Sequence, residues 1–251
     1  MDIAFFSPSS LFESEEDDDK QQVQGEVNES SSDLYIQRNH TFPGQKDICI
    51  REFSFHCLNA NLLWPGTFAF SEWLLQNNSF LQGNRHRILE LGSGTGALAI
   101  FLRTTFGVDI TTSDYDDGEI EENIAHNCRV NEIEVLPHIR HTWGETFPRE
   151  HPDWDVIIAS DILLYVKQYL NLIKTLRFLL LEGSRAREMR IAGKEVRCPV
   201  FVMSWRRRIG KKDEDLFFGE CQRAGFVVEH VGSRVYVISS PTPKTVVVVE
   251  S

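Results

Sequence analysis

One short stretch, RILELGSGTGALAI (residues 87–100), constrains the fold more than any other part of the sequence. Five residues of buried-strand character run directly into Gly92, Gly94 and Gly96, and an apolar run of helical character follows. A strand, a glycine turn and a helix in this order are typical of the first unit of an α/β sheet, where the turn lets the main chain approach a nucleotide. The stretch therefore predicts an α/β fold with a nucleotide site where this strand ends.

The rest of the chain continues the alternation of strands and helices. The patterns predict strands at 87–91, 108–114, 134–143, 154–161 and 199–205, and helices at 96–106, 118–132, 169–180 and 213–226. Two further strands, 227–231 and 234–239, lie close enough for an antiparallel hairpin at Gly232 and Ser233. We expect a Rossmann-like α/β sheet of seven strands, mostly parallel, with one antiparallel strand.

Two elements are expected before this sheet. Residues 33–53 alternate apolar and polar residues around Pro43 and Gly44, which predicts an N-terminal β-hairpin. LLWPGTFAFSEWLLQNN (residues 62–78) predicts a helix that starts near Pro65, because proline is favoured in the first helical position.

The net charge of −11 is concentrated at the N-terminus. Residues 1–33 hold ten acidic side chains and one lysine, so we expect an acidic, disordered tail there. The remainder is close to neutral and predicts no nucleic-acid partner. The basic stretches 185–197 and 206–212 are expected to be exposed loops. We place the domain at 34–240 and a C-terminal tail at 241–251.

Composition excludes several other classes. The five cysteines form no CxxC pair, which indicates reduced thiols and a cytoplasmic or nuclear protein. No apolar run reaches the roughly 20 residues that span a bilayer, so no membrane partner is expected. The eight histidines include no HExxH motif, and no metal site is expected. Nothing in the pattern requires more than a monomer.

The glycine stretch admits more than one nucleotide. GSGTGA (residues 92–97) fits a dinucleotide pattern, and Asp114 follows about 20 residues later at a strand end, where a carboxylate holds ribose hydroxyls. NAD is therefore one interpretation. Three features favour a different ligand: the carboxylate of Glu90 would repel a pyrophosphate and attract a cation, the loop lies in mid-chain, and the C-terminal hairpin is foreign to a plain dinucleotide fold.

Further motifs occur in a fixed order along the chain. They read LLWPGTFAFSEWL, ILELGSGTGALAI, ITTSDYD, ENIAHNCRVN, HTWGE, IIASDILLYV and VMSWRRR. In this order they resemble the seven-strand S-adenosylmethionine-dependent methyltransferases, and among these the methyltransferase-like 21 group, which methylates protein lysines. The resemblance extends from about residue 42 to residue 240 and implies S-adenosyl-L-methionine as cofactor and a protein substrate.

The resemblance also implies roles for individual residues. Gly92, Ser93 and Gly94 would line the cofactor loop, which Glu90 and Gly96 would shape. The residues around it would be Asp114 on the ribose, Trp143 beside the adenine, Trp64 at the methionine end, and Ser160 in the pocket wall. A helix N-cap is the alternative role for Asp114, and core packing is the alternative for the tryptophans.

The acceptor end departs from the group's pattern. The lysine-methylating branch carries D-x-x-Y or D-x-x-F after the fourth strand, whereas this chain has Asp161 followed by Leu164, with Tyr165 one residue later. We predict Asp161 and Tyr165 as catalytic residues and keep Tyr169 as a second candidate aromatic. The departure leaves open methylation of a small-molecule nitrogen, or a scaffold that binds the cofactor without turnover. The sequence shows no set of residues suited to hydride transfer, which disfavours an NAD-linked oxidoreductase.

Overall fold

The computed structural model describes residues 35–56, 59–82, 86–182, 187–206, 210–232 and 234–241. The predicted acidic tail, and all of the predicted C-terminal tail beyond Pro241, lie outside these residues. The boundaries proposed for the domain therefore remain predictions.

A seven-stranded sheet organises the described residues, as predicted. Its strand order is β10-β11-β9-β6-β3-β4-β5. The strands are β3 (Arg87–Leu91), β4 (Asp109–Asp114), β5 (His138–Arg140), β6 (Val156–Ser160), β9 (Val200–Ser204), β10 (Val227–Gly232) and β11 (Val235–Ser239). Strand β11 pairs antiparallel with both of its neighbours, and all other pairs in the sheet are parallel.

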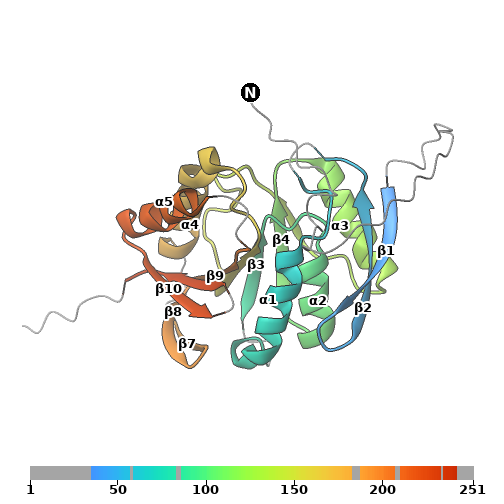
Figure 1. Ribbon diagram of the computed structural model, residues 1–251, viewed down its shortest axis with the longest axis horizontal. Helices are drawn as coiled ribbons and strands as arrows, with labels where there is room; N and C mark the ends of the chain where they lie inside the picture. Colours follow the sequence, from blue (N-terminus) through green and yellow to red (C-terminus); the bar gives the residue numbers. More distant parts are fainter. Residues whose placement is uncertain are drawn as a thin grey trace, which may run out of the picture. The chain divides into compact units, whose positions relative to one another are not determined.

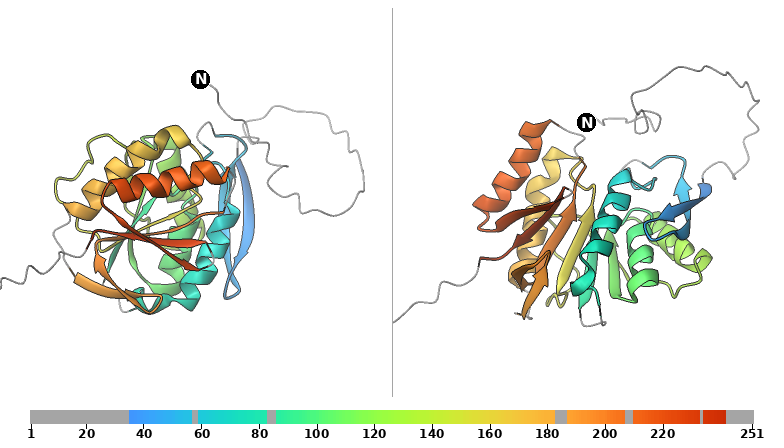
Figure 2. Two further views of the ribbon diagram at one scale, coloured as in Figure 1. Left: turned by 60° about the vertical axis from the view of Figure 1, so that its left-hand side comes forward. Right: turned by 60° about the horizontal axis from the view of Figure 1, so that its bottom comes forward.

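Helices cover both faces of this sheet. They are α1 (Pro65–Gln76), α2 (Ala97–Phe106), α3 (Gly118–Val130), α4 (Tyr169–Leu181) and α5 (Lys211–Arg223), with short 3-10 turns η2 (Asn78–Phe80) and η3 (Val166–Gln168). Helices α1, α2 and α3 lie on one face, and α4 and α5 lie on the other (Figures 1 and 2). Val156 and Ile158 of β6 pack toward the first group, whereas Ile157 and Ala159 pack toward the second. Burial on both faces explains the continuous apolar runs in the sequence.

The predicted N-terminal hairpin forms from β1 (Tyr35–Phe42) and β2 (Lys46–Phe53) and stays separate from the main sheet. It lies beside α2 and α3 (Figure 1). Three asparagines spaced by four residues on one face of α3, Asn123, Asn127 and Asn131, form hydrogen bonds with the main chain of Cys49 or Arg51 in β2. These side-chain amides satisfy the strand edge that faces the helix, which gives a structural reason for the asparagine spacing.

Two predicted segments differ from the structure. Residues 187–197 were expected to be an exposed loop, but they form a second hairpin of β7 (Arg187–Ile191) and β8 (Lys194–Cys198). Its buried residues Met189, Ile191 and Val196 alternate with charged residues, so the period-two signal is hidden by a basic composition. The predicted strand at 134–143 is reduced to β5, an edge strand that pairs with β4 alone.

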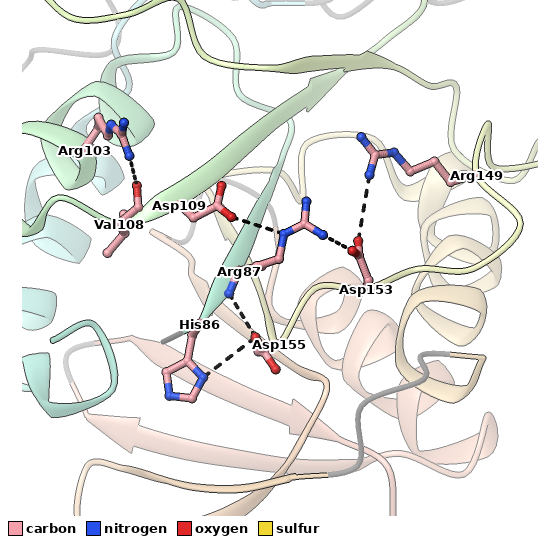
Figure 3. Close-up of polar contacts among 8 residues, drawn as sticks. All are labelled: His86, Arg87, Arg103, Val108, Asp109, Arg149, Asp153 and Asp155. Carbon is pink, nitrogen blue, oxygen red and sulfur yellow. Dashed lines mark hydrogen bonds and ion pairs between the residues drawn. The ribbon is translucent and has the colours of Figure 1, made fainter. Parts of the chain in front are cut away.

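A polar network closes the sheet at the amino ends of its central strands. Figure 3 draws its residues, His86, Arg87, Arg103, Val108, Asp109, Arg149, Asp153 and Asp155. The Arg87 guanidinium contacts Asp153 and, at 3.2 Å, Asp109, while its main-chain N–H donates to the fully buried Asp155 at 2.9 Å. This network belongs to the stability of the fold, because the cavity described next opens at the opposite edge.

Candidate functional site

The carboxyl ends of β3, β4 and β6 converge on one cavity. Ligands of open α/β sheets bind at this edge, because the loops that follow parallel strands meet there. Every residue predicted for the site lines the cavity except Gly96 and the alternative aromatic residue Tyr169. Gly96 is instead the N-cap of α2, immediately behind the glycine loop.

The glycine loop requires its first glycine. Gly92 has a φ of 66°, in the left-handed region that side chains disfavour. A Cβ at this position would also lie 2.7 Å from Cγ2 of Ile162. The loop can therefore bring its main chain to the cavity wall only without a side chain here.

Asp114 is anchored by the main chain. Its Oδ2 accepts a hydrogen bond from the N–H of Gly94 at 2.6 Å, and its Oδ1 accepts one from Tyr115 at 2.8 Å. Burial raises the pKa of Asp114, and the two amides oppose that rise. The helix cap of α3 is Asp117, which accepts from Glu119 N at 2.8 Å. The capping role is thus taken by another residue, and each Asp114 oxygen keeps a lone pair for a further hydroxyl.

Glu90 provides a second carboxyl group at the cavity, in a different environment. It is 2% exposed, and burial raises its pKa to about 8. Within the described part of the chain, its Oε2 atom has no hydrogen-bond partner. A buried acceptor of this kind favours a cationic ligand, whose charge would restore ionisation of the carboxyl group.

Asn59 connects two aromatic residues that line the cavity. Its side-chain Nδ2 donates to the hydroxyl of Tyr165 at 2.5 Å, and its main-chain carbonyl accepts from the indole Nε1 of Trp64 at 3.0 Å. Trp64 precedes α1 and Tyr165 precedes η3, so Asn59 holds together two walls that come from distant parts of the chain.

Tyr165 is the aromatic residue that reaches the cavity at the acceptor end. Leu164 and Tyr165 both line it, because the chain turns into η3 directly after Tyr165. The alternative, Tyr169, is absent from the lining and is buried beside Leu163, whose carbonyl accepts from its hydroxyl at 3.1 Å. The displacement by one residue therefore leaves an aromatic side chain at the site.

Asp161 is bonded to the main chain on both sides. Its Oδ2 accepts from Gly66 N at 2.7 Å, and its Oδ1 accepts from Arg206 N at 2.9 Å. Since both oxygens bind main-chain amides, the carboxylate has a positioning role between the start of α1 and the end of β9. A catalytic role for Asp161 stays a prediction.

Several cavity residues escaped the sequence prediction. They are chiefly Asn59, Thr67, Tyr115, His141 and Thr142. Tyr115 and Thr142 adjoin the predicted residues Asp114 and Trp143, so adjacency could have identified them. The hydroxyl of Thr67 lies 3.0 Å from that of Ser160, a contact between residues far apart in the sequence that only the fold brings about. Asn59 follows no motif, and no sequence signal identifies it.

The described ranges contain neither a cluster of metal-ligating side chains nor a membrane-spanning helix. No group of three or more histidine, cysteine, aspartate or glutamate side chains is arranged there to hold a metal ion. None of the helices in these ranges has the length and hydropathy of a membrane span.

The chain matches one protein family and is similar in sequence to several known proteins. Residues 45–222 match the family described as lysine methyltransferase. The chain is 22% identical over 198 residues to the protein N-terminal and lysine N-methyltransferase efm7 of Schizosaccharomyces pombe, covering 75% of this chain and 72% of that protein. It is 29% identical over 128 residues to the histone-arginine methyltransferase METTL23 of Xenopus laevis, covering 50% and 53%.

The solved structures to which this chain is similar include the ribosomal protein L11 methylase from Lactobacillus delbrueckii subsp. bulgaricus. The TM-score is 0.46 and the identity 15%, over 68% of this chain and 78% of that one. The matched stretch spans about half the length of several curated relatives, including METTL23.

Proposed function

Since the chain belongs to the lysine methyltransferase family, we propose that it transfers a methyl group from S-adenosyl-L-methionine to a lysine side chain of a protein. The observation that carries this proposal is the cavity itself. A main-chain-anchored carboxylate, a buried carboxyl group with one oxygen that lacks a hydrogen-bond partner, and the side chains of Trp64, Tyr115, Trp143 and Tyr165 meet there.

S-adenosylmethionine, the cofactor of this family, fits the residues present. It supplies an electrophilic methyl group on a sulfonium, together with an ammonium group and an adenosine. Asp114 would accept from the ribose hydroxyls, and Glu90 would pair with the cationic end. Trp143 would pack on the adenine, and Trp64 offers an indole face to positive charge.

The chemistry of the acceptor end favours lysine over arginine. A guanidinium remains protonated in proteins and is oriented by carboxylates. In the described part of the cavity, the acidic residues are Glu90, Asp114 and Asp161. Asp161 is already oriented by two main-chain amides, so it offers a guanidinium only the remaining lone pair of each oxygen. A lysine amine needs no such partner once it has lost its proton.

The transfer is an in-line displacement. S-adenosylmethionine would supply the electrophilic methyl carbon. The lysine ammonium would first lose its proton to solvent, and the amine nitrogen would then form the new bond as the carbon–sulfur bond broke and the sulfur kept the electron pair. This chain's part is to desolvate and align the amine. Trp64 and Tyr165, joined by Asn59, would form the aromatic walls that hold it.

The test uses the whole chain and an extract from cells depleted of it. The extract is incubated with methyl-labelled S-adenosylmethionine and the wild-type chain or the Asp114→Ala variant. Proteins are then hydrolysed and their amino acids separated. Label in methyl-lysine with the wild type, and its loss with the variant, is the expected result. Label in methyl-arginine would contradict the preference for lysine.

Methylation of a small molecule is the second candidate, and Leu164 at the usual aromatic position favours it. The same incubation separates the two, because label would then appear in the low-molecular-weight fraction before hydrolysis. Binding of S-adenosylhomocysteine without transfer to any fraction would instead indicate a cofactor-binding scaffold.

A further inference from the structure

Asn127 makes contacts in two directions from the middle of α3. Its Oδ1 accepts from the main-chain N–H of Arg51 at 2.8 Å, and its Nδ2 donates to the carbonyl of Arg51 at 3.2 Å. The same Nδ2 donates to the carbonyl of Thr95 at 2.9 Å. Asn127 is fully buried, so these bonds are shielded from water.

Thr95 belongs to the glycine loop. It lies between Gly94 and Gly96, is 3% exposed and lines the cavity. Both flanking glycines have positive φ angles, 51° and 76°, and neither has a side chain that could fix the loop by packing. The loop is held by its own turn bond, from Gly96 N–H to the Ser93 carbonyl at 2.7 Å, and by contacts from other segments, of which the bond from Asn127 is one.

We propose that Asn127 is a positioning residue for the cofactor, and that through it the N-terminal hairpin supports the glycine loop. A single buried amide joins the main chain of β2 to the main chain of the loop. This inference rests on S-adenosylmethionine as cofactor, and it is independent of the methyl acceptor.

The other two asparagines that contact β2, Asn123 and Asn131, offer matched controls. Asn123 is as fully buried as Asn127 and also donates to the carbonyl of Arg51, at 3.1 Å, but its other side-chain bond is with the Arg51 guanidinium and not with the loop. Asn131 holds Cys49 in the same way, by its N–H and its carbonyl. Removing either one weakens the attachment of the hairpin without removing the bond to Thr95.

The experiment is calorimetric titration of the full-length chain and three variants with S-adenosylhomocysteine. Loss of the Asn127 amide leaves the buried Thr95 carbonyl unsatisfied, so we expect Asn127→Ala to weaken binding by about 10-fold. We expect Asn123→Ala and Asn131→Ala to stay within about twofold of the wild type, even where thermal unfolding shows a similar loss of stability.

Two results would overturn the proposal. One is unchanged affinity in Asn127→Ala, and the other is an equal loss of affinity in Asn123→Ala, which would make the effect a general consequence of loosening the hairpin. Failure of the wild type itself to bind would overturn the cofactor assignment along with this inference.

Hydrogen exchange of the wild-type chain gives a second readout that needs no variant. The amide of Arg51 bonds to Asn127, and the amide of Cys49 bonds to Asn131. If the loop and β2 are coupled through Asn127, addition of S-adenosylhomocysteine should slow exchange at Arg51 more than at Cys49. Equal change at both amides, or none, would contradict the coupling.

Discussion

Glu90 and Asp114 show how position within one cavity separates two similar side chains. Asp114 is held by two main-chain amides, which stabilise its charge although it is buried. Glu90 has an oxygen without such a donor, and burial dominates its pKa. Asp114 is therefore suited to accept hydrogen bonds from hydroxyl groups, and Glu90 is suited to bind a positively charged group.

Replacement of Asp114 tests the ribose assignment. Asp114→Ala removes a hydrogen-bond acceptor and releases the N–H of Gly94, so we expect S-adenosylhomocysteine binding to weaken by about 10- to 100-fold. The exposed neighbour Asp116 serves as control, and Asp116→Ala should bind normally. Calorimetry of both variants decides the matter, and equal affinities would remove Asp114 from the cofactor site.

The pH dependence of binding tests Glu90. Its pKa is raised to about 8 in the cofactor-free chain, and a nearby cation lowers the pKa of a carboxyl group. Binding below pH 8 therefore releases a proton. The affinity for S-adenosylhomocysteine should rise as the pH rises toward 8 and then level off.

Two controls isolate that effect. In Glu90→Gln the rise should disappear, because the amide does not titrate. In the wild type, 5′-methylthioadenosine, which lacks the amino-acid part, should show a flatter profile. A profile for S-adenosylhomocysteine that is the same in the wild type and in Glu90→Gln would refute the pairing.

At the scale of elements, the start of α1 depends on one close approach. Pro65 occupies the first turn, and the N–H of Gly66 donates to Asp161. A Cβ on Gly66 would lie 2.3 Å from Oδ2 of that carboxylate. The glycine of the WPG motif is therefore required by a contact between α1 and the end of β6. The sequence shows the motif, but only the structure shows this reason for it.

Gly66→Ala tests this contact, with Gly118→Ala as its control. Gly118 starts α3, and a Cβ there would meet Arg140 no closer than an ordinary 3.5 Å. We expect Gly66→Ala to lower the free energy of unfolding by about 1–3 kcal/mol through overpacking. Gly118→Ala should be neutral or stabilising by up to about 1 kcal/mol, because alanine favours the helix. Urea unfolding measures both, and equal stabilities would contradict the predicted clash.

At the scale of the whole molecule, the described residues that line the cavity all lie between Asn59 and Gln168, far from both ends of the chain. We therefore expect a chain shortened to residues 34–240 to bind S-adenosylhomocysteine as tightly as the full chain. Calorimetry of the two chains makes the comparison. Weaker binding by the shortened chain would show that the acidic N-terminal stretch or the C-terminal stretch contributes to the site.

The sequence alone determined the order of strands and helices along the chain and most of the residues predicted for the cofactor side of the cavity. Apolar runs such as Val156–Ala159 report burial on both faces, and Gly92 and Asp114 lie in fixed places relative to a strand end. These signals depend only on residues close together in the sequence, so they can be recognised without knowledge of the fold. The same local reading missed β7 and β8, whose alternating pattern is covered by charged residues.

Only the tertiary structure decided the acceptor side and the supports of the glycine loop. Asn59 meets Tyr165 across 106 residues, and Asn127 meets Arg51 across 76. It also showed that Asp161 binds the amides of Gly66 and Arg206. Such pairings have no period and no neighbouring motif, because they depend on how separately formed elements pack. The physical reason is that a hydrogen bond between distant segments is encoded by the geometry of the whole fold and not by any one stretch of it.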